Sequence, residues 1–469
     1  MTFFMQIKNF FNDLWHIKEP MSRFRVAQLL FIWSLTFAWC KEGFMRVAAF
    51  LAMLLMWKTM PMPQFSLKGK DFSRTTFCLV MVFFLWIFTV PMIFGVTTVA
   101  EELQSFVKPL EVLVFILLSL FFFRGDDFED KFAFWSVVGL STFIFSCAVN
   151  RYTHNFNDTS GLNSAFLNFS PMAASHYIAM WFSCLTYYVF RKKTSIAICI
   201  LAFCAMSLAL PLAIVTYYRG SITVIVGITL FSILFAFLLI RQSLTIKIGV
   251  IASIIAFNAL AGFLICSYVD LSVPSAIWSS RLQLRMVSKN GKQVSIGDIF
   301  AEWQKIGEEG QDATSQGAEL DAEHLTTGRM SAWKQTIAKI KEKPIAGYGL
   351  GKSFKSFNIK SELSHELHTS EIITHPHNMM LQAAVHTGLP GMGLFALSQL
   401  ALFFLALSKT VASKKQTLYF IFAMMVIAKF FAGLTEGFFM PARYFLVPFW
   451  CLAFYVMLND SQKDDPASI

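Results

Sequence analysis

Residues 77–96 read FCLVMVFFLWIFTVPMIFGV, a run of twenty residues without a charged side chain. At 1.5 Å of rise per residue, a helix of this length crosses the ~30 Å hydrocarbon core of a bilayer. Other apolar runs, some of them shorter, occupy residues 26–40, 44–58, 107–123, 132–149, 172–190, 195–218, 220–240, 248–269, 391–408, 417–435 and 440–458. The sequence therefore predicts an all-α polytopic membrane protein with about 12 transmembrane helices.

The composition excludes a single water-soluble globule. Of the 469 residues, 56% are hydrophobic and only 14% are charged, whereas a soluble chain carries roughly 25% charged residues. The formal net charge of +10 does not point to a nucleic-acid partner, because the long hydrophilic stretch from Asp270 to Pro376 holds 13 basic and 13 acidic residues. The positive excess lies in short stretches between apolar runs, as the positive-inside rule requires.

These charges predict the orientation. Basic residues recur in every second connection, for example at Arg191-Lys192-Lys193, which places both termini in the cytoplasm. We therefore expect four segments: an N-terminal membrane domain over 1–269, an outer loop over 270–390, C-terminal membrane helices over 391–458, and a cytoplasmic tail over 459–469. The chemistry is expected on the outer side.

The outer loop is not uniform. Residues 286–324 are polar, so this segment is not expected to form a hydrophobic core. An amphipathic helix is predicted from Arg329, because Met330, Trp333, Ile337 and Ile340 recur at helical spacing. Pro344 ends this helix, a glycine-rich loop follows over 347–351, and a second, interfacial helix is predicted from His377 to the Gly-Leu-Pro-Gly break at 388–391.

Three polar residues at predicted helix ends are candidates for chemistry. His377 begins the interfacial helix, where the helix dipole disfavours an imidazolium and favours a neutral general base; the alternative is a capping role. Arg219 occupies a tight outer turn and could hold a lipid phosphate, although boundary arginines usually snorkel to headgroups. Arg329 adds a guanidinium at a helix start, and Arg443, near Glu436, is a further candidate for which a structural ion pair is the alternative.

Two other patterns point to different chemistry. The stretch Gly347 to Ser353 resembles a phosphate-binding loop, but its glycine spacing is wrong and no strand precedes it. His365, His368, His375 and His377 are dense enough to suggest a metal, but they lack helical His-x3-His spacing and a partnering cysteine. A tight turn and, for His365 and His368, solvated loop histidines are the preferred interpretations, and no metal or cofactor is expected.

At this point the chain resembles the bacterial O-antigen ligase family. His377-Asn378, nine further residues and then Gly-x-x-Gly at 388–391 match that family's pattern. The same resemblance extends to the predicted twelve spans and single large outer loop. It also extends to three short segments, namely Gly328-Arg329, residues 343–351 and Arg219-Gly220.

The resemblance implies a metal-independent, inverting glycosyltransferase of the GT-C-like fold class, acting at the periplasmic face of the inner membrane. Its donor would be a glycan on undecaprenyl diphosphate, and its acceptor the lipid A-core oligosaccharide. Carried over by position, Arg219 and Arg329 bind the diphosphate and His377 deprotonates the acceptor hydroxyl. Further substrate-binding residues would be Asn378, His375 and Arg443.

Other functions remain open at the level of sequence. The superfamily also contains O-antigen and exopolysaccharide polymerases, which use the same donor, and protein O-oligosaccharyltransferases. A polysaccharide-lipid transporter is the non-enzymatic alternative, and it would need charges along a path through the membrane. Only Glu111 and Lys429 lie near the midplane of predicted spans.

Overall fold

A computed structural model shows a chain that is helical throughout its described part. The structure describes residues 3–37, 42–57, 71–94, 99–124, 128–153, 171–190, 196–215, 219–239, 243–268, 329–352, 354–359, 376–412, 417–435 and 447–458. Within these ranges every regular element is a helix, fourteen α-helices and one short 3-10 helix. This confirms the all-helical prediction.

The helices before the long loop, in chain order, are α1 (Phe3–Trp15), α2 (Pro20–Thr36), α3 (Glu42–Met56), α4 (Asp71–Ile93), α5 (Val99–Phe122), α6 (Phe128–Thr153), α7 (Pro171–Phe190), α8 (Ile196–Val215), α9 (Arg219–Leu239) and α10 (Leu244–Tyr268). After it come α14 (Arg329–Glu342), the 3-10 helix η2 (Phe354–Phe357), α16 (Met379–Ala412), α17 (Thr417–Thr435) and α18 (Val447–Leu458).

The twelve predicted apolar runs each coincide with a helix, from α2 to α10 and from α16 to α18. Three helical stretches in the described residues are both long and apolar enough to cross a bilayer: Phe72–Ile93, Phe128–Val149 and Met379–Ala412. Shorter apolar helices account for much of the remainder. The structure is that of a helical membrane protein, and the number of twelve crossings stays a prediction.

The centre of the bundle is aromatic. Trp181 of α7 and Trp450 of α18 are each 1% exposed, and the rings of Phe128 and Phe132 of α6 pack beside Tyr455 and Trp181. Close crossings need small residues: a Cβ on Gly139 of α6 would lie 2.5 Å from the Thr36 carbonyl oxygen at the end of α2. Aromatic volume therefore fills the core, and glycine permits approach where backbones meet.

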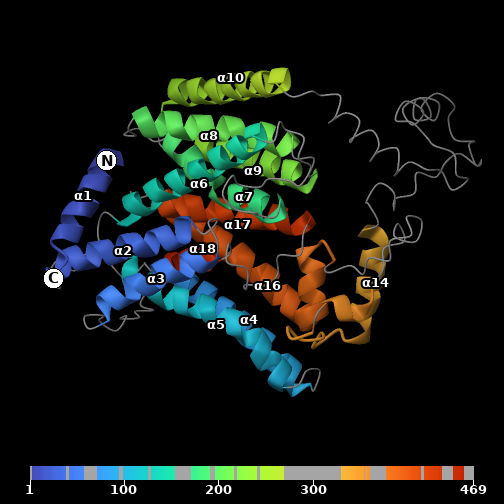
Figure 1. The fold of residues 1–469 in the computed structure, drawn as a ribbon. Coiled ribbons are helices and arrows are strands. Elements are labelled where there is room, and N and C mark those ends of the chain that lie inside the picture. Colours follow the sequence, from blue (N-terminus) through green and yellow to red (C-terminus); the bar gives the residue numbers. More distant parts are fainter. Residues whose placement is uncertain are drawn as a thin grey trace, which may run out of the picture.

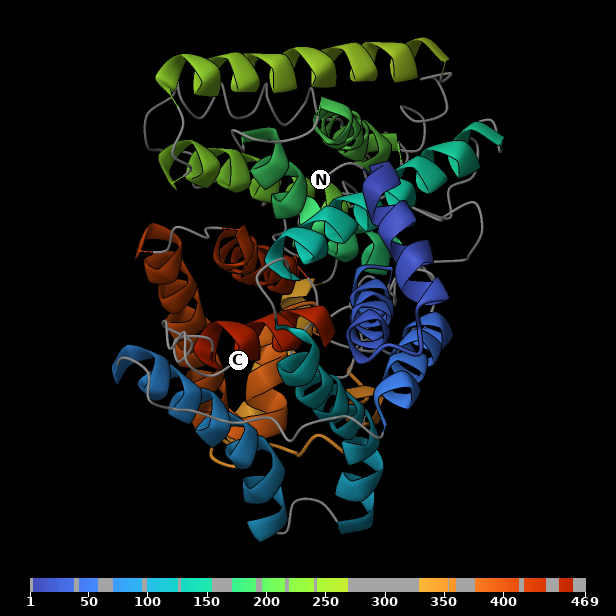
Figure 2. The same cartoon turned by 90° about the vertical axis from the view of Figure 1, so that its left-hand side faces the viewer.

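The bundle has two different ends. Figure 1 shows α2 and α17 running across the view, with α1 upright at the left edge and α14 upright at the right. Figure 2 looks at the same bundle from the α1 end. We call the right-hand side of Figure 1, where α14 lies against the start of α16, the α14 end.

The sequence did not predict α1. Its thirteen residues mix apolar and polar side chains and contain no apolar run of spanning length. The interfacial helix starts later than predicted, at Met379, and α16 continues past the break as a kinked helix with Gly388 at φ 71° and ψ 176°. His365, His368, His375, Glu436, Arg443 and the 286–324 segment lie outside the described residues.

Candidate functional site

The α14 end contains a corner in which α14, the loop after it and the start of α16 pack together. Its apolar core is small and is built from Ala332, Ile340, Phe354, Ile359, Ala384 and Val385. The predicted apolar stripe of α14 is partly wrong, because Ile337 is 42% exposed and the buried positions are Ala332, Thr336 and Ile340. The inward face of α14 therefore mixes small and large side chains, packed against Phe354, Ile359 and Val385.

Backbone hydrogen bonds hold the loop to α16. Tyr348 N–H donates to the Val385 carbonyl and Gly349 N–H to the His386 carbonyl, each over 2.9 Å. In a continuous helix these carbonyls would accept from residues 389 and 390, but residue 390 is proline and has no N–H. Leu389 N–H instead donates to the Pro344 carbonyl over 2.7 Å. The kink at Gly388 thus exchanges hydrogen bonds within the helix for bonds to the loop.

Two glycines make this exchange possible. A Cβ on Gly388 would lie 2.0 Å from the Ile345 carbonyl oxygen, and one on Gly347 would lie 2.5 Å from the His386 carbonyl carbon. Both residues also have positive φ, 71° and 67°, a region that side chains other than glycine rarely adopt. The close approach of the loop and the positive φ therefore explain why glycine occupies the first position of the Gly-x-x-Gly pattern.

His377 lies between two fixed neighbours. The Trp333 indole N–H of α14 donates to the Pro376 carbonyl over 2.7 Å. On the other side, Asn378 Oδ1 accepts from the N–H groups of Met380 and Leu381 at 2.9 and 3.1 Å, which makes Asn378 the N-cap of α16. His377 itself has φ 50° and is only partly buried.

This geometry corrects the expected position of His377. The residue precedes the first helical residue by two positions, and Asn378 takes the capping role that was the alternative for the histidine. Because the Asn378 oxygen caps the helix, its amide nitrogen is the part that could bind a substrate. His377 is thus held in a strained turn at a helix N-terminus, with its ring outside the helix.

The helices that carry the other two predicted residues, Arg219 and Arg329, begin near this corner. Arg329 is the first residue of α14 and precedes Trp333 by one turn, so the start of α14 is close to Pro376. Arg219 is the first residue of α9, and Gly227 two turns later packs on Phe431 of α17. Gly433 of the same helix touches Met379. The starts of α9, α14 and α16 therefore gather around one end of α17, although the two arginine side chains themselves are not described.

The structure adds a histidine that the sequence reading did not single out. His386 is 4% exposed, and its Nδ1 lies 2.8 Å from the Gly349 carbonyl oxygen. Because a carbonyl can only accept, Nδ1 carries the proton in this contact. The Trp86 indole N–H of α4 donates a further hydrogen bond to the Thr387 carbonyl over 3.0 Å. His386 is too enclosed to meet a sugar and instead positions the loop against α16.

The exposed side of the corner carries a small polar cluster. Lys339 pairs with Glu342 at 2.7 Å, and the Tyr348 hydroxyl donates to the same carboxylate. Hydrogen bonds from Lys339 and then Tyr348 hold the pKa of Glu342 below its usual value. Partial burial and the Glu342 carboxylate raise the pKa of Tyr348 to about 12. Both groups are therefore fixed in their neutral-pH forms.

The glycine loop cannot bind phosphate in the manner of a nucleotide-binding loop. The N–H groups of Tyr348 and Gly349, which such a loop would aim at phosphate, are used by the carbonyls of α16. Within the described part of the chain, no group of three histidine, cysteine, aspartate or glutamate residues has the geometry of a metal site. The prediction of a tight turn agrees with the structure.

A comparison with protein families matches residues 204–396 to the family described as O-Antigen ligase. The match covers less than half of the chain and includes Arg219, Arg329, His377 and the break at 388–391. It confirms the resemblance drawn from the motifs, and it supports glycan transfer of the ligase or polymerase type. No match was found among curated proteins.

Proposed function

We propose that this protein is an O-antigen ligase, which transfers a glycan from undecaprenyl diphosphate to the lipid A-core oligosaccharide at the periplasmic face of the inner membrane. The observation that carries the proposal is the gathering of three helix starts at one end of α17, each beginning at or just after a residue of the family pattern. The family match over residues 204–396 supports the same chemistry.

The reaction is a displacement at the anomeric carbon of the donor glycan. The acceptor hydroxyl oxygen forms the new bond to that carbon, and the bond from the carbon to the diphosphate oxygen breaks with its electron pair leaving on the diphosphate. The hydroxyl proton passes to His377. Attack opposite the leaving group inverts the anomeric configuration, and undecaprenyl diphosphate is released.

His377 is suited to the role of general base. It is the partly buried histidine of the corner, whereas His386 is enclosed and its Nδ1 is engaged with a carbonyl. Trp333 and Asn378 fix the backbone on both sides of His377, and the residue stays partly exposed. A positioned base of this kind contributes roughly 10²–10⁴-fold to a rate.

Arg219 and Arg329 are proposed to hold the diphosphate. Each begins a helix, where unsatisfied N–H groups and the helix dipole add to the attraction of a guanidinium for an anion. Neutralising the leaving diphosphate lets two arginines do what a divalent cation does in other transferases, through preorganised electrostatics. A donor with a polyprenyl tail also explains why the site lies at the end of a membrane bundle.

The decisive experiment is reconstitution in liposomes with a polyprenyl-diphosphate glycan and purified rough lipopolysaccharide. We expect ligation by the unaltered protein and a loss of about 10²-fold or more for His377→Ala, Arg219→Ala and Arg329→Ala. Lys341→Ala, an exposed substitution on α14, is the matched control and should remain active. Ligation by His377→Ala at the normal rate would refute the catalytic assignment.

The same assay separates a ligase from a polymerase. With the donor alone, a polymerase lengthens the glycan on the lipid diphosphate, whereas a ligase leaves it unchanged until acceptor is added. Chain growth without lipopolysaccharide would therefore overturn ligation while leaving the transfer chemistry at His377 intact.

A further inference from the structure

Helix α1 lies outside the catalytic region and has no role in the proposed transfer. Its thirteen residues extend ~20 Å, too short to cross a bilayer. In Figure 1 it stands upright at the edge opposite α14, whereas α2, into which the chain turns immediately afterwards, runs across the view. The turn from α1 to α2 therefore changes the direction of the chain from across the bundle to along it.

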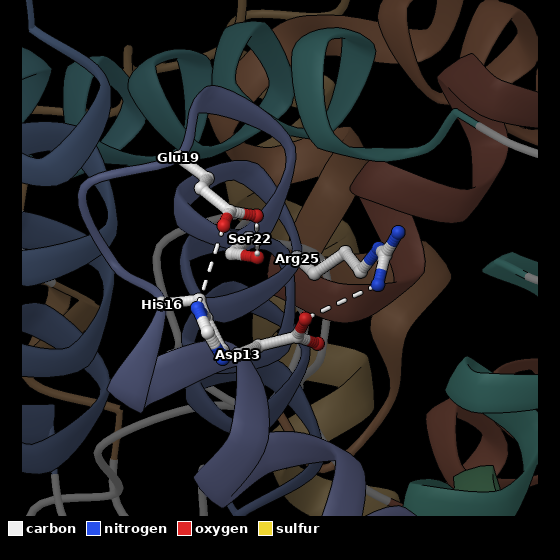
Figure 3. A network of polar contacts seen from close by, with 5 residues as sticks. All are labelled: Asp13, His16, Glu19, Ser22 and Arg25. Carbon is white, nitrogen blue, oxygen red and sulfur yellow. Dashed lines mark hydrogen bonds and ion pairs between the residues drawn. The ribbon is translucent and has the colours of Figure 1, made fainter.

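A polar network fixes this turn (Figure 3). Arg25 of α2 pairs with Asp13 of α1 at 3.1 Å, although Asp13 is only 7% exposed. Glu19, at the start of α2, receives the Ser22 hydroxyl at 3.5 Å and lies 3.4 Å from His16. The ring of Phe10 also packs 5.3 Å from that of Trp33. α1 is thus docked on α2 in a defined orientation and does not extend freely from the bundle.

Docking leaves a defined face of α1 uncovered. Gln6 and Asp13 are buried against the bundle, whereas Phe11 is 62%, Leu14 44% and Trp15 87% exposed. Lys8, one turn before Phe11 and two before Trp15, is exposed on the same side. At 100° per residue, Asn9 points roughly 160° away from Phe11. The helix therefore has a docked face and an uncovered aromatic face bordered by a lysine, and Asn9 lies on neither of them.

We propose that α1 is an in-plane helix whose Phe11 and Trp15 enter the boundary between headgroups and acyl chains, with Lys8 beside anionic lipid phosphates. Aromatic side chains with an adjacent cation, on a helix too short to span, are typical of membrane-surface helices. The first 25 residues contain four basic and two acidic side chains, so the segment is complementary to an anionic leaflet. This proposal does not depend on the transferase function.

A lipid surface explains the uncovered face better than a second protein does. An exposed apolar side chain also stands on the other side of the turn, where Met21, the second residue of α2, is 65% exposed. Apolar exposure both on an in-plane helix and at the start of α2, a predicted span, fits the boundary of a bilayer. Lys18, at the turn itself, is also exposed at this level.

The test uses the full-length protein with a photoreactive benzophenone side chain in place of Phe11 or Trp15. The matched control carries it in place of Asn9, which is exposed on another side of the helix, roughly 160° from Phe11. In liposomes of phosphatidylethanolamine and phosphatidylglycerol, we expect at least about fivefold more lipid adduct from positions 11 and 15 than from position 9. Equal yields at all three positions, or adducts between two copies of the chain from position 11, would overturn the proposal.

A second measurement keeps the lipid contact separate from folding. Phe11→Asp with Trp15→Asp should raise amide hydrogen exchange in residues 3–15 several-fold in liposomes, because the helix then leaves the boundary. Asn9→Asp should leave that exchange unchanged. Exchange that is unaltered in the double variant would also contradict an in-plane position.

Discussion

The corner at the α14 end and the membrane core around Lys429 of α17 are stabilised in opposite ways. In the corner, three backbone hydrogen bonds and two glycines join the loop to α16 around a small apolar cluster. In the core, large aromatic side chains surround one polar group. Lys429 Nζ lies 4.3, 4.8 and 5.0 Å from the ring centres of Phe449, Trp450 and Phe395, and 3.3 Å from Gln399 Oε1.

The difference follows from what each region can bury. The corner has little apolar surface, so its backbone polar groups must be satisfied at close range, and any added atom breaks several contacts together. The core is closely packed by volume, so it depends on shape more than on any one polar bond. We therefore expect the corner to reject a single added methyl group and the core to accept loss of an amine if its volume is kept.

The largest effect is expected for Gly388→Ala. The new Cβ would lie 2.0 Å from the Ile345 carbonyl oxygen at φ 71°, so the loop must leave α16, at a cost of about 4 kcal/mol. Transfer activity should be lost with it, because His377 is held by the same corner. Gly393→Ala, in the same helix with nothing within 4 Å, should change stability by no more than ~1 kcal/mol. Thermal unfolding in detergent measures both, and equal shifts would remove the basis of the comparison.

Substitutions of Lys429 test whether the aromatic core depends on packed volume. Lys429→Ala leaves a cavity between three rings and an unpaired Gln399, which should destabilise the protein by about 2–3 kcal/mol. Lys429→Met keeps most of the volume and should cost less than ~1.5 kcal/mol. If both variants unfold alike, the amine rather than the volume stabilises the core, and the distinction between the two regions fails.

The partners of the two midplane charges also bear on the transporter alternative. Glu111 accepts a bidentate pair from Arg46 at 2.7 and 2.9 Å, and Lys429 is 3% exposed among aromatic rings. Both residues contact protein groups in ways that structural polar residues do. The arrangement is better explained by helix packing than by a transport path.

Trp333→Phe should have an intermediate effect. It removes the indole N–H that holds the Pro376 carbonyl and leaves the ring, so we expect a loss of about 1 kcal/mol in stability. The loss in kcat should exceed what unfolding explains, because Pro376 precedes His377. Trp57→Phe, on a side chain that is 71% exposed, is the matched control. A normal kcat for Trp333→Phe would show that this bond does not position His377.

The sequence predicted more of the fold than of the site. Apolar length located the helices, and the lack of an N–H on Pro390 together with the freedom of Gly388 located the break in α16. It could not predict that Ala332 and Thr336, rather than Ile337, face inward, because this depends on which distant segments, such as Phe354 and Val385, pack against α14. His386 was missed for the same reason, since its partner is a carbonyl 37 positions away.

The start of α16 shows how local rules compete. His377 and Asn378 are adjacent, and either could cap a helix. The shorter asparagine side chain reaches the N–H groups of Met380 and Leu381, and the histidine is displaced into a left-handed turn. Hydrophobic periodicity does not distinguish the two capping residues, so the predicted helix start is two residues too early.

The smallest effect, and the one that most sharpens the view of the corner, is the pH dependence at Tyr348. The pKa of Glu342 is lowered in the folded protein, so its contribution is present above the unfolded value of ~4.3 and is lost as the pH falls through the folded value. The pKa of Tyr348 is raised to about 12, so its contribution is present below ~10 and is lost as the pH rises through about 12.

Between these limits, Tyr348→Phe should be destabilised by a constant amount, smaller than for Trp333→Phe because the cluster is exposed. Below ~pH 4 the difference should shrink as Glu342 takes up a proton, and Glu342→Gln should abolish that change. Unfolding curves of the three proteins across this range provide the measurement. A difference that persists unchanged in acid would mean that the hydroxyl stabilises the corner independently of the Glu342 carboxylate.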